Sequence, residues 1–408
     1  MKRQYMEGVT FVGRWPLQFS TAAPYIEELL SREVPVHFVV SQPVARLFHQ
    51  ILRRGRSIIS LEELEGRHRA ARLAHAAISR ISAVVNRGEA RNRKRNAACK
   101  LGVSAVLRNP LPTRKVVHVT KSNVPWLLCA RDVQVYTVAG SWDHPAKFGA
   151  TGYQSHLVFT WNGDLADDWR ACQGDEHFGI SYPFVFDYLL DPEVLCTRAG
   201  RPLGHHVLYP FTSSSASDPQ LFREEMLFAS ALIGACSRIG LPVFVKPKPN
   251  GVPGELDPLG RAGEVSIGAY FENNRKENIL LTAEYNAARI AELSKARISV
   301  NIATTFAFDA ALFGLPVAQM EIRAPEALPM LTRLQAHLHT QRHVLGVRRS
   351  NHVIDDDSPL TDQLHRITAD WDRVEVSARE HSQRLYEWIL PGQGMAENIR
   401  SVADAILN

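Results

Sequence analysis

The sequence lacks the apolar runs and the paired cysteines that mark membrane-spanning and disulfide-rich proteins. No apolar run approaches the roughly 20 residues that cross a bilayer. The first residues, Met-Lys-Arg-Gln-Tyr-Met-Glu, have no apolar core of a secretory signal. The cysteines form no C-x-x-C pair, which argues against a structural zinc site. We therefore expect a cytoplasmic protein with reduced thiols at Cys99, Cys129, Cys172, Cys196 and Cys236.

Internal repeats and low-complexity tracts are also missing. The 408 residues are 45% hydrophobic and 22% charged, which suits a globular enzyme with two domains of roughly 200 residues each. Apolar β-branched runs alternate with helical patterns, and this alternation predicts two doubly wound α/β sheets. The expected strands are 9–12, 34–40, 103–107, 116–119, 133–138, 156–161, 206–211, 243–246, 264–270 and 298–302. The expected helices are 24–31, 45–54, 218–239, 282–296 and 378–407, the last broken at Pro391.

Acidic residues are nearly absent between Arg67 and Lys100. This segment has ten lysines and arginines and one acid, Glu89. Its first part is amphipathic, so it predicts a basic helix that lies on an anionic membrane surface or attracts an anionic substrate. A solvated helix face is the alternative. Nucleic-acid binding is not favoured, because the run has no interleaved aromatic residues and no recognition motif accompanies it.

The most informative segment runs from Ile298 to Val317. It predicts a buried strand, a two-threonine turn and a helix that begins near Phe306. Thr304 and Thr305 would lie at the helix N-terminus, where free N–H groups and the helix dipole favour a phosphate. Asp309, one turn into the helix, could accept hydrogen bonds from ribose hydroxyls. An ordinary strand–helix–strand unit explains the same pattern.

The pattern Thr-Thr-x-x-x-Asp-Ala-x-x-x-Gly-x-Pro-Val resembles the nucleotide-binding segment of GT-B glycosyltransferases. Asp309 stands where that family usually has Glu, so the charge is kept and about one methylene of reach is lost. The resemblance implies a GT-B-like α/β fold, with two Rossmann-like doubly wound domains that face a cleft. It implies a nucleotide-sugar donor as substrate and no other cofactor.

Two further segments supply donors for the phosphates. The run from Leu208 to Ala216 leads from a strand into a hydroxyl-rich loop, where Thr212, Ser213, Ser214 and Ser215 offer hydroxyl and backbone donors to a pyrophosphate. A polar surface turn is the alternative.

The segment Val243-Phe-Val-Lys-Pro-Lys-Pro249 holds Lys246 and Lys248 at a strand end, because its prolines prevent a helix. It resembles the Arg-Pro-His-Pro segment of teichoic-acid-type glycerophosphate transferases. Lys248 replaces the His of that segment, so an acid–base role of the imidazole does not carry over, whereas the positive charge does.

A loop between residues 138 and 149 resembles the Thr-Trp-Asp-Asn-x-x-x-Lys-Gly loop of the same transferases. Asp143 and His144 are adjacent ionisable groups on this Gly- and Pro-containing loop. Either one suits a general base that takes the proton of the acceptor hydroxyl. The alternative is that Asp143 caps a turn and His144 is incidental. Farther along, Asn162 and Asp187 could line the cleft.

These observations predict a metal-independent glycosyltransferase that moves a sugar to a glycan or lipid-linked acceptor, in bacterial surface polysaccharide synthesis. Residues 1–200 would bind the acceptor and residues 201–385 the donor. Residues 386–408 would form a helix that crosses back to the first domain. The enzyme would be cytoplasmic and peripheral on the inner membrane face, held there by the residues from Arg67 to Lys100.

Three alternatives stay open. One is a polyol-phosphate transferase of the CDP-glycerol type, which the Lys at position 248 argues against. Another is a GT-B-fold nucleotide-sugar epimerase, which needs acidic and His catalytic groups that the sequence does not locate. The third is a non-enzymatic basic protein associated with membranes or nucleic acid, whose binding would fall steeply with salt.

Overall fold

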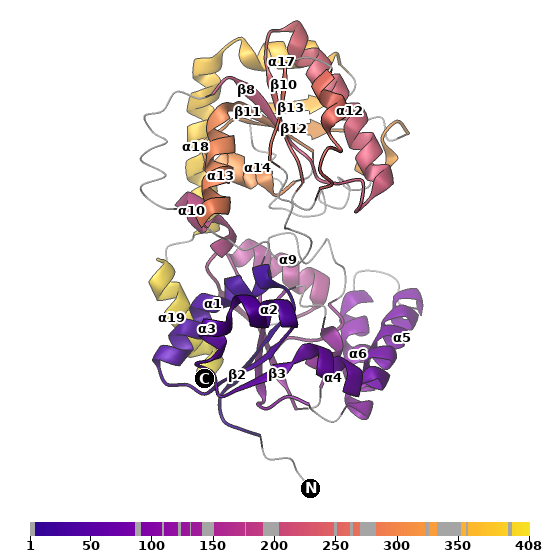
Figure 1. Ribbon diagram of the computed structural model, residues 1–408, viewed down its shortest axis with the longest axis vertical. Helices are drawn as coiled ribbons and strands as arrows, with labels where there is room; N and C mark the ends of the chain where they lie inside the picture. Colours follow the sequence, from indigo (N-terminus) through magenta and orange to yellow (C-terminus); the bar gives the residue numbers. More distant parts are fainter. Residues whose placement is uncertain are drawn as a thin grey trace. The chain divides into compact units, whose positions relative to one another are not determined.

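The computed structural model describes residues 5–85, 91–107, 110–120, 124–130, 132–140, 151–175, 177–190, 204–248, 251–261, 264–269, 283–302, 304–322, 326–332, 352–355, 358–390 and 394–408. The chain divides into two compact units (Figure 1). The first comprises Met1–Val185 and Ile389–Asn408, and the second comprises Phe186–Trp388.

A parallel sheet forms the centre of the first unit. Within the described residues it has seven strands in the order β3-β2-β1-β4-β5-β6-β7, and every neighbouring pair is parallel. Most of its strands are buried on both faces, which is why they appear in the sequence as continuous apolar runs. The strands are β1 (Val9–Gly13), β2 (Val36–Val40), β3 (Ser57–Ser60), β4 (Lys115–Val119), β5 (Gln134–Val138), β6 (Leu157–Thr160) and β7 (Phe178–Ile180).

Helices cover both faces of this sheet. Phe11 of β1 packs into a core with α1 and α19, whereas the next residue, Val12, packs into a core with α4, α6 and α7. The alternation follows from the two-residue period of a strand. The helices are α1 (Pro16–Ser31), α2 (Gln42–Leu47), α3 (His49–Leu52), α4 (Leu61–Arg67), α5 (Arg69–Val85), α6 (Arg91–Val106), α7 (Pro125–Leu128), α9 (Gly163–Gln173) and α19 (Met395–Leu407).

The predicted strand at 103–107 is wrong, because these residues belong mostly to α6. Asn96, Cys99, Val103 and Leu107 are buried at spacings of three and four residues, which is the period of one helix face. The β-branched Val103 and Val106 suggested a strand, but Cys99, Val103 and Leu107 pack into a core with α4 and α7, and α6 also contacts α5. The predicted helix at 45–54 is divided into α2 and α3 at Phe48, and β3 was not predicted.

The C-terminal helix α19 packs in the first unit, against α1 and β7. Val402, Ala403 and Ile406 are fully buried in the core that contains Phe11. Lys115 of β4 donates to the carbonyl oxygen of Leu407. Apolar burial and a partly buried hydrogen bond therefore hold α19 on this sheet.

The second unit is built around another parallel sheet. Within the described residues it has six strands in the order β10-β9-β8-β11-β12-β13, again with parallel neighbours. The predicted strand at 243–246 is confirmed as β9. The strands are β8 (His206–Pro210), β9 (Val243–Lys246), β10 (Val265–Ile267), β11 (Ala296–Asn301), β12 (Val317–Glu321) and β13 (His352–Asp355).

The helices of the second unit lie on both sides of its sheet, with α12 on one side and α13 on the other (Figure 1). Asp218 caps the longest of them, α12, by accepting from the Leu221 backbone N–H at 3.1 Å, and Pro219 occupies the first turn. The helical elements are η1 (Phe184–Phe186), α10 (Asp187–Leu190), α12 (Pro219–Arg238), η2 (Asp257–Arg261), α13 (Ala283–Lys295), α14 (Phe306–Leu312), α17 (Leu360–Thr368) and α18 (Trp371–Ile389).

Both sheets have a topological switch point, where the direction of strand addition reverses. It lies between β1 and β4 in the first sheet and between β8 and β11 in the second. Open parallel sheets bind ligands outside the carboxyl ends of their strands at such points. The two switch points are therefore the first places to look for a functional site.

Candidate functional site

The donor residues expected from the sequence gather at the switch point of the second sheet. The loop 212–215 follows β8, and Thr304 and Thr305 follow its neighbour β11. Lys246 ends β9, which pairs with β8 on the other side. Because the strands are parallel, their carboxyl ends lie along one edge of the sheet. Three segments that are far apart in sequence thus share one edge.

Two buried ion pairs link this edge to α13. Lys246 pairs with Glu292, and Arg289 pairs with Asp309 of α14. The centre of the Phe306 ring is 5.0 Å from the Lys246 ammonium and 5.9 Å from the Arg289 guanidinium carbon. We call Lys246, Glu292, Arg289, Asp309 and Phe306 the ion-pair cluster. In Figure 1 its helices α13 and α14 lie together with α10.

Burial controls the electrostatics of the ion-pair cluster. Its four charged side chains are between 1% and 9% exposed. Burial lowers the pKa of Lys246 below its ordinary value, although the carboxylate of Glu292 acts in the opposite direction. Desolvated charges of this kind are tolerated when each has a partner, and they occur often at functional sites.

Asp309 has protein partners at the position where the sequence suggested a ribose contact. Its Oδ1 accepts from the Tyr188 hydroxyl of α10 at 2.5 Å and from Arg289. The Arg289 guanidinium also lies 4.5 Å from the centre of the Tyr188 ring. The carboxylate thus joins α10, α13 and α14 in the structure, and a ribose contact stays a prediction.

The turn before α14 is stabilised by Thr304. Its hydroxyl accepts from the Phe306 backbone N–H at 2.9 Å, and its own N–H donates to Asn301 Oδ1 at 3.1 Å. Thr305 occupies the N-cap position, but its side chain makes no capping hydrogen bond. Both threonines are only partly buried. The turn is therefore held by one threonine, while the hydroxyl of the other is not used by the cap.

Most donors of the loop 212–215 already bind carboxylates, whereas those of Ser214 contact the Ser217 hydroxyl. The backbone N–H groups and hydroxyls of Thr212 and Ser213 all donate to Glu225, and both donors of Ser215 bind Glu255 at 2.8 and 2.7 Å. Burial raises the pKa of Glu225 above its ordinary value despite these hydrogen bonds. Glu225 thus occupies the place that the sequence suggested for a pyrophosphate, so a phosphate would have to displace it or bind beyond it.

The two lysines of the β9 segment differ. Lys246 is 4% exposed and is paired inside the ion-pair cluster. Lys248 is only partly buried, and its ammonium lies 3.4 Å from the Ser217 hydroxyl, which in turn contacts Ser214. Lys248 is therefore the better placed of the two to contact a ligand, and Lys246 is part of the support beneath.

Asp143 and His144 lie outside the described residues, so their roles stay predictions. The chain is described up to Gly140, whose N–H donates to the Thr120 hydroxyl at 2.9 Å at the carboxyl end of β4. The other predicted residues, Asn162 and Asp187, begin helices. Asn162 Oδ1 caps α9 by accepting from the Leu165 N–H, and Asp187 starts α10.

The switch point of the first sheet adds residues that sequence reasoning missed. Arg14 follows β1 and pairs with Glu65, and Gln18 donates to the Thr120 carbonyl oxygen at 2.8 Å. Arg14 Nε and Gln18 Oε1 are buried, and among the described residues neither atom has a hydrogen-bond partner. A donor and an acceptor beside a sheet switch point suit a hydroxyl-bearing ligand.

In the second unit, sequence reasoning missed Arg289, Glu292 and Tyr188. Arg289 and Glu292 are three residues apart on α13, so they share a helix face, and that spacing was the available signal. Among the described residues, no group of three or more His, Cys, Asp or Glu side chains is placed to hold a metal ion. The same residues include no helix that is long and apolar enough to span a bilayer. Cys99, Cys129, Cys172 and Cys236 are free thiols, and Cys196 lies outside the described residues.

Solved structures of similar fold match nearly the whole chain. UDP-glucose: anthocyanidin 3-O-glucosyltransferase, in complex with UDP, is 10% identical, with a TM-score of 0.50 over 99% of this chain and 100% of that chain. The UDP-GlcNAc 2-epimerase of Methanocaldococcus jannaschii, in complex with UDP-GlcNAc and UDP, is 10% identical, with a TM-score of 0.49 over 98% and 99%. CalG4, the calicheamicin glycosyltransferase, is 14% identical, with a TM-score of 0.48 over 98% of both chains. No protein-family model matches the chain, and no curated protein matches its sequence.

At such low identity a structural match speaks for the fold alone. Together with the two parallel sheets and their strand orders, it shows a GT-B-like α/β fold with two Rossmann-like doubly wound domains. The fold predicted from the sequence is confirmed. The likeness to teichoic-acid-type transferases remains a prediction from sequence motifs.

Proposed function

We propose that the protein is a glycosyltransferase that uses a nucleotide-activated sugar. One observation carries the proposal most strongly: the segments after β8, β9 and β11 share the carboxyl edge of the second sheet, beside its switch point. Lys248, Thr304 and Thr305 lie on these segments with cationic and hydroxyl groups that suit a diphosphate. The ion-pair cluster supports them from below.

In this proposal the second unit binds the donor. Lys248 and Thr305 contact the phosphates, with Ser214 next to the Lys248 partner Ser217. The phosphates also accept hydrogen bonds from Thr212, Ser213 and Ser215, once these residues no longer donate to Glu225 and Glu255. Lys246, paired with Glu292, holds the strand end that leads to Lys248, and Asp309 orients the ribose.

The first unit would present the acceptor. Asp143 or His144 takes the proton of the acceptor hydroxyl while the nucleoside diphosphate leaves, and no metal ion takes part. Arg14 and Gln18 would orient the acceptor at the first switch point. Removal of a general base typically lowers turnover by a factor of about 100 to 10,000. Asp143→Asn and His144→Gln therefore separate the two candidates, since only the base variant should lose transfer while still binding nucleotide.

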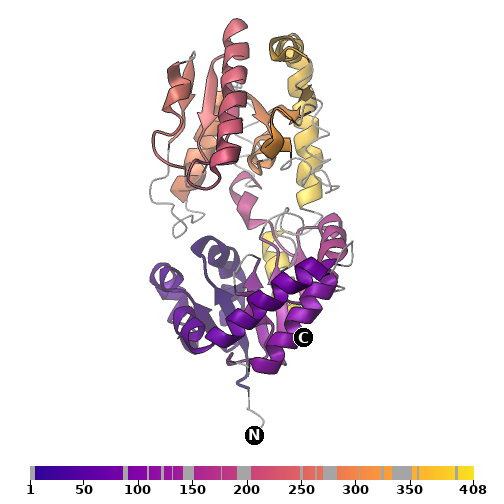
Figure 2. The same cartoon turned by 90° about the vertical axis from the view of Figure 1, so that its right-hand side faces the viewer.

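The acceptor would be a glycan or a lipid-linked sugar at the inner membrane face, as in bacterial surface polysaccharide synthesis. Support comes from α5, whose exposed face carries Arg69, Arg72 and Arg80 beside Leu73 and Ile81. The two apolar side chains are 62% and 63% exposed. A helix face with arginines, large apolar residues and no acid suits an anionic lipid surface. Figure 2 shows α5 beside α6.

The test is thermal unfolding with UDP, GDP, CDP, CMP, ADP and dTDP. A nucleotide at about 100 times its Kd should add roughly 2.7 kcal/mol to the free energy of unfolding. Lys248→Ala and Thr305→Ala should lose much of this shift, whereas Lys295→Ala should keep it. Lys295 is an exposed lysine of the same unit, at the end of α13 where β11 begins.

Two outcomes would contradict the proposal. One is a folded wild-type protein whose stability no nucleotide changes. The other is full binding by both Lys248→Ala and Thr305→Ala. If one nucleotide binds, transfer is measured as the release of that nucleotide from the matching sugar nucleotide.

A further inference from the structure

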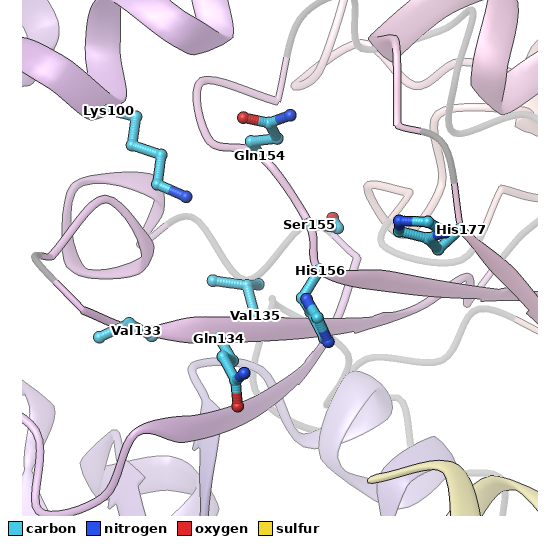
Figure 3. Close-up of a pocket in the computed structure, with 8 residues that line it drawn as sticks. All are labelled: Lys100, Val133, Gln134, Val135, Gln154, Ser155, His156 and His177. Atoms are coloured by element: carbon cyan, nitrogen blue, oxygen red, sulfur yellow. The ribbon is translucent and has the colours of Figure 1, made fainter. Parts of the chain in front are cut away.

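A polar pocket of about 370 Å³ lies in the first unit, at the amino ends of β5, β6 and β7 (Figure 3). Gln134 begins β5, residues 154–156 precede β6, and His177 precedes β7, while Lys100 enters from α6. We call it the amino-edge pocket. Ligands of doubly wound sheets bind at the carboxyl ends, which is the opposite edge. The amino-edge pocket is therefore separate from the candidate site described above.

Three basic side chains line the amino-edge pocket. Figure 3 shows Lys100 reaching from its helix toward the strand residues, with His156 and His177 opposite it. The two imidazole rings lie 6.5 Å apart, centre to centre. The eight lining residues include no acid. An ammonium with two imidazoles that can each donate suits an anion that has several acceptor oxygens, such as a phosphate dianion.

The remaining lining suits a neutral polyol. Gln134, Gln154 and Ser155 carry amide and hydroxyl groups that donate and accept, and Val133 and Val135 add apolar surface. The volume lies within the roughly 300–1,000 Å³ of small-molecule sites. A phosphate ion alone would fill a small part of this space, so there is room for a body with hydroxyl groups.

The wall at residues 154–156 is held in place before any ligand arrives. The Ser155 N–H donates to Asp175 at 3.0 Å, and the Ser155 hydroxyl lies 2.9 Å from that of Thr137. The His156 N–H donates to the Val135 carbonyl oxygen at 2.7 Å, and the Tyr136 ring meets the imidazole edge-on at 5.5 Å. Fixed lining residues reduce the entropy lost on binding.

Asp175, the acid bonded to this wall, is 2% exposed. Its second oxygen accepts from the Trp169 indole N–H at 2.7 Å. Burial raises the pKa of Asp175 above its ordinary value, against the hydrogen bonds from Trp169 and Ser155 and the charge of Lys100. Asp175 therefore holds the wall from behind the residues that line the pocket.

We propose that the amino-edge pocket binds a phosphate monoester of a small polyol or sugar. Lys100, His156 and His177 bind the phosphate, and Gln134, Gln154 and Ser155 bind the hydroxyl groups. The proposal is independent of glycosyl transfer. It assigns the first unit a second ligand, bound away from the acceptor.

The test is isothermal titration of the full chain with glycerol 3-phosphate, glucose 6-phosphate, inorganic phosphate and glucose. The histidine side-chain NMR signals are recorded in parallel. We expect saturable binding of an ester that shifts the signals of His156 and His177, with weaker binding of inorganic phosphate and none of glucose. Lys100→Met and the double variant His156→Asn/His177→Asn should each weaken the ester about 10-fold or more, since each removes charge-assisted hydrogen bonds.

Matched controls use a lysine and a histidine that do not line the pocket. Lys94→Met changes an exposed lysine of the same helix, and His49→Asn an exposed histidine of α3; both should bind like the wild type. Lys248→Ala should also bind normally, which separates this pocket from the proposed donor site. The proposal is overturned if no ester binds saturably, if Lys100→Met binds as tightly as the wild type, or if inorganic phosphate matches the esters.

Discussion

Lys246 at the end of β9 and Glu292 of α13 form an ion pair with only 5% and 9% of their side chains exposed. The pair connects the carboxyl edge of the second sheet to the helix that precedes β11. Water is almost excluded, so each charge depends on the other. Substitution of Lys246 and Glu292, alone and together, therefore tests whether this ion pair stabilises the candidate site.

Removal of one partner should destabilise the protein more than removal of both. Lys246→Met leaves Glu292 buried and unpaired, which typically lowers the free energy of unfolding by about 3–5 kcal/mol. The double variant Lys246→Met/Glu292→Leu should recover most of this loss, because no unpaired charge remains. Urea unfolding measures both. Lys248→Met, two residues away and partly exposed, is the control and should change stability by about 0.5 kcal/mol or less. A double variant no more stable than the single would contradict the role of pairing.

Substitution of Asp309 by Glu, the residue that GT-B glycosyltransferases usually have at the corresponding position, should destabilise the protein. Its side chain is 1% exposed and bonded to Tyr188 and Arg289. Asp309→Glu adds a methylene to a filled space, and overpacking of this kind costs about 1–3 kcal/mol. Thermal or urea unfolding tests this prediction. As a comparison, Tyr188→Phe removes only the hydroxyl that donates to Asp309, and it should lower the free energy of unfolding by about 1 kcal/mol. Unchanged stability in Asp309→Glu would show that the pocket has room for Glu.

His118 should make the first unit sensitive to acid. Burial lowers the pKa of His118 from 6.5 to about 4. The unfolded chain therefore takes up the proton more readily, so the stabilisation is fully present above about pH 6.5 and is lost as the pH falls toward 4. For this fully buried group the loss is roughly 3 kcal/mol. His118→Gln should lose less stability across that window, as measured by urea unfolding at pH 7 and pH 4.5. An equal loss in both proteins would assign the effect to other groups.

The exposed face of α5 should bind anionic lipid vesicles. Each arginine near such a surface contributes about 1 kcal/mol, so Arg69→Gln/Arg80→Gln should weaken binding to phosphatidylglycerol vesicles by roughly 10- to 30-fold. Vesicle sedimentation in low and high salt measures this, and salt should weaken wild-type binding. The control is Arg223→Gln/Arg366→Gln, which removes the same charge from the second unit. Equal binding by both double variants would contradict the assignment to α5.

The sequence predicted most of the fold because the strands are buried on both faces. β2, β4 and β9 are mostly apolar runs bounded by Pro or polar residues, and such runs are visible without tertiary information. The prediction failed at α6, where β-branched residues outweighed the four-residue spacing of Cys99 and Val103. It also missed β3, a short edge strand that is only partly buried.

The candidate site was predictable in part. Lys246, Thr304 and Asp309 lie on segments that the sequence assigned to the carboxyl edge, and strand topology alone brings those segments together. Their partners were not predictable. Tyr188 is 121 residues from Asp309 and Arg289 is 20 residues from it, so these contacts exist only after the helices pack on the sheet. The hydrogen bonds from Thr212 and Ser213 to Glu225 likewise form only after α12, which carries Glu225, has packed on the sheet.

The helix α19 follows the second unit in the chain but packs in the first unit, and this affects the order in which the two units can fold during synthesis. The segment that completes the core around Phe11 is synthesised after the whole of the second unit. A nascent chain that has emerged through Trp388 holds all the residues of the second unit, yet its first unit still exposes the apolar surface that Val402 and Ile406 will cover. The second unit can therefore mature before the first, and a stop codon between Trp388 and α19 would damage the first unit although it leaves the residues of the second intact.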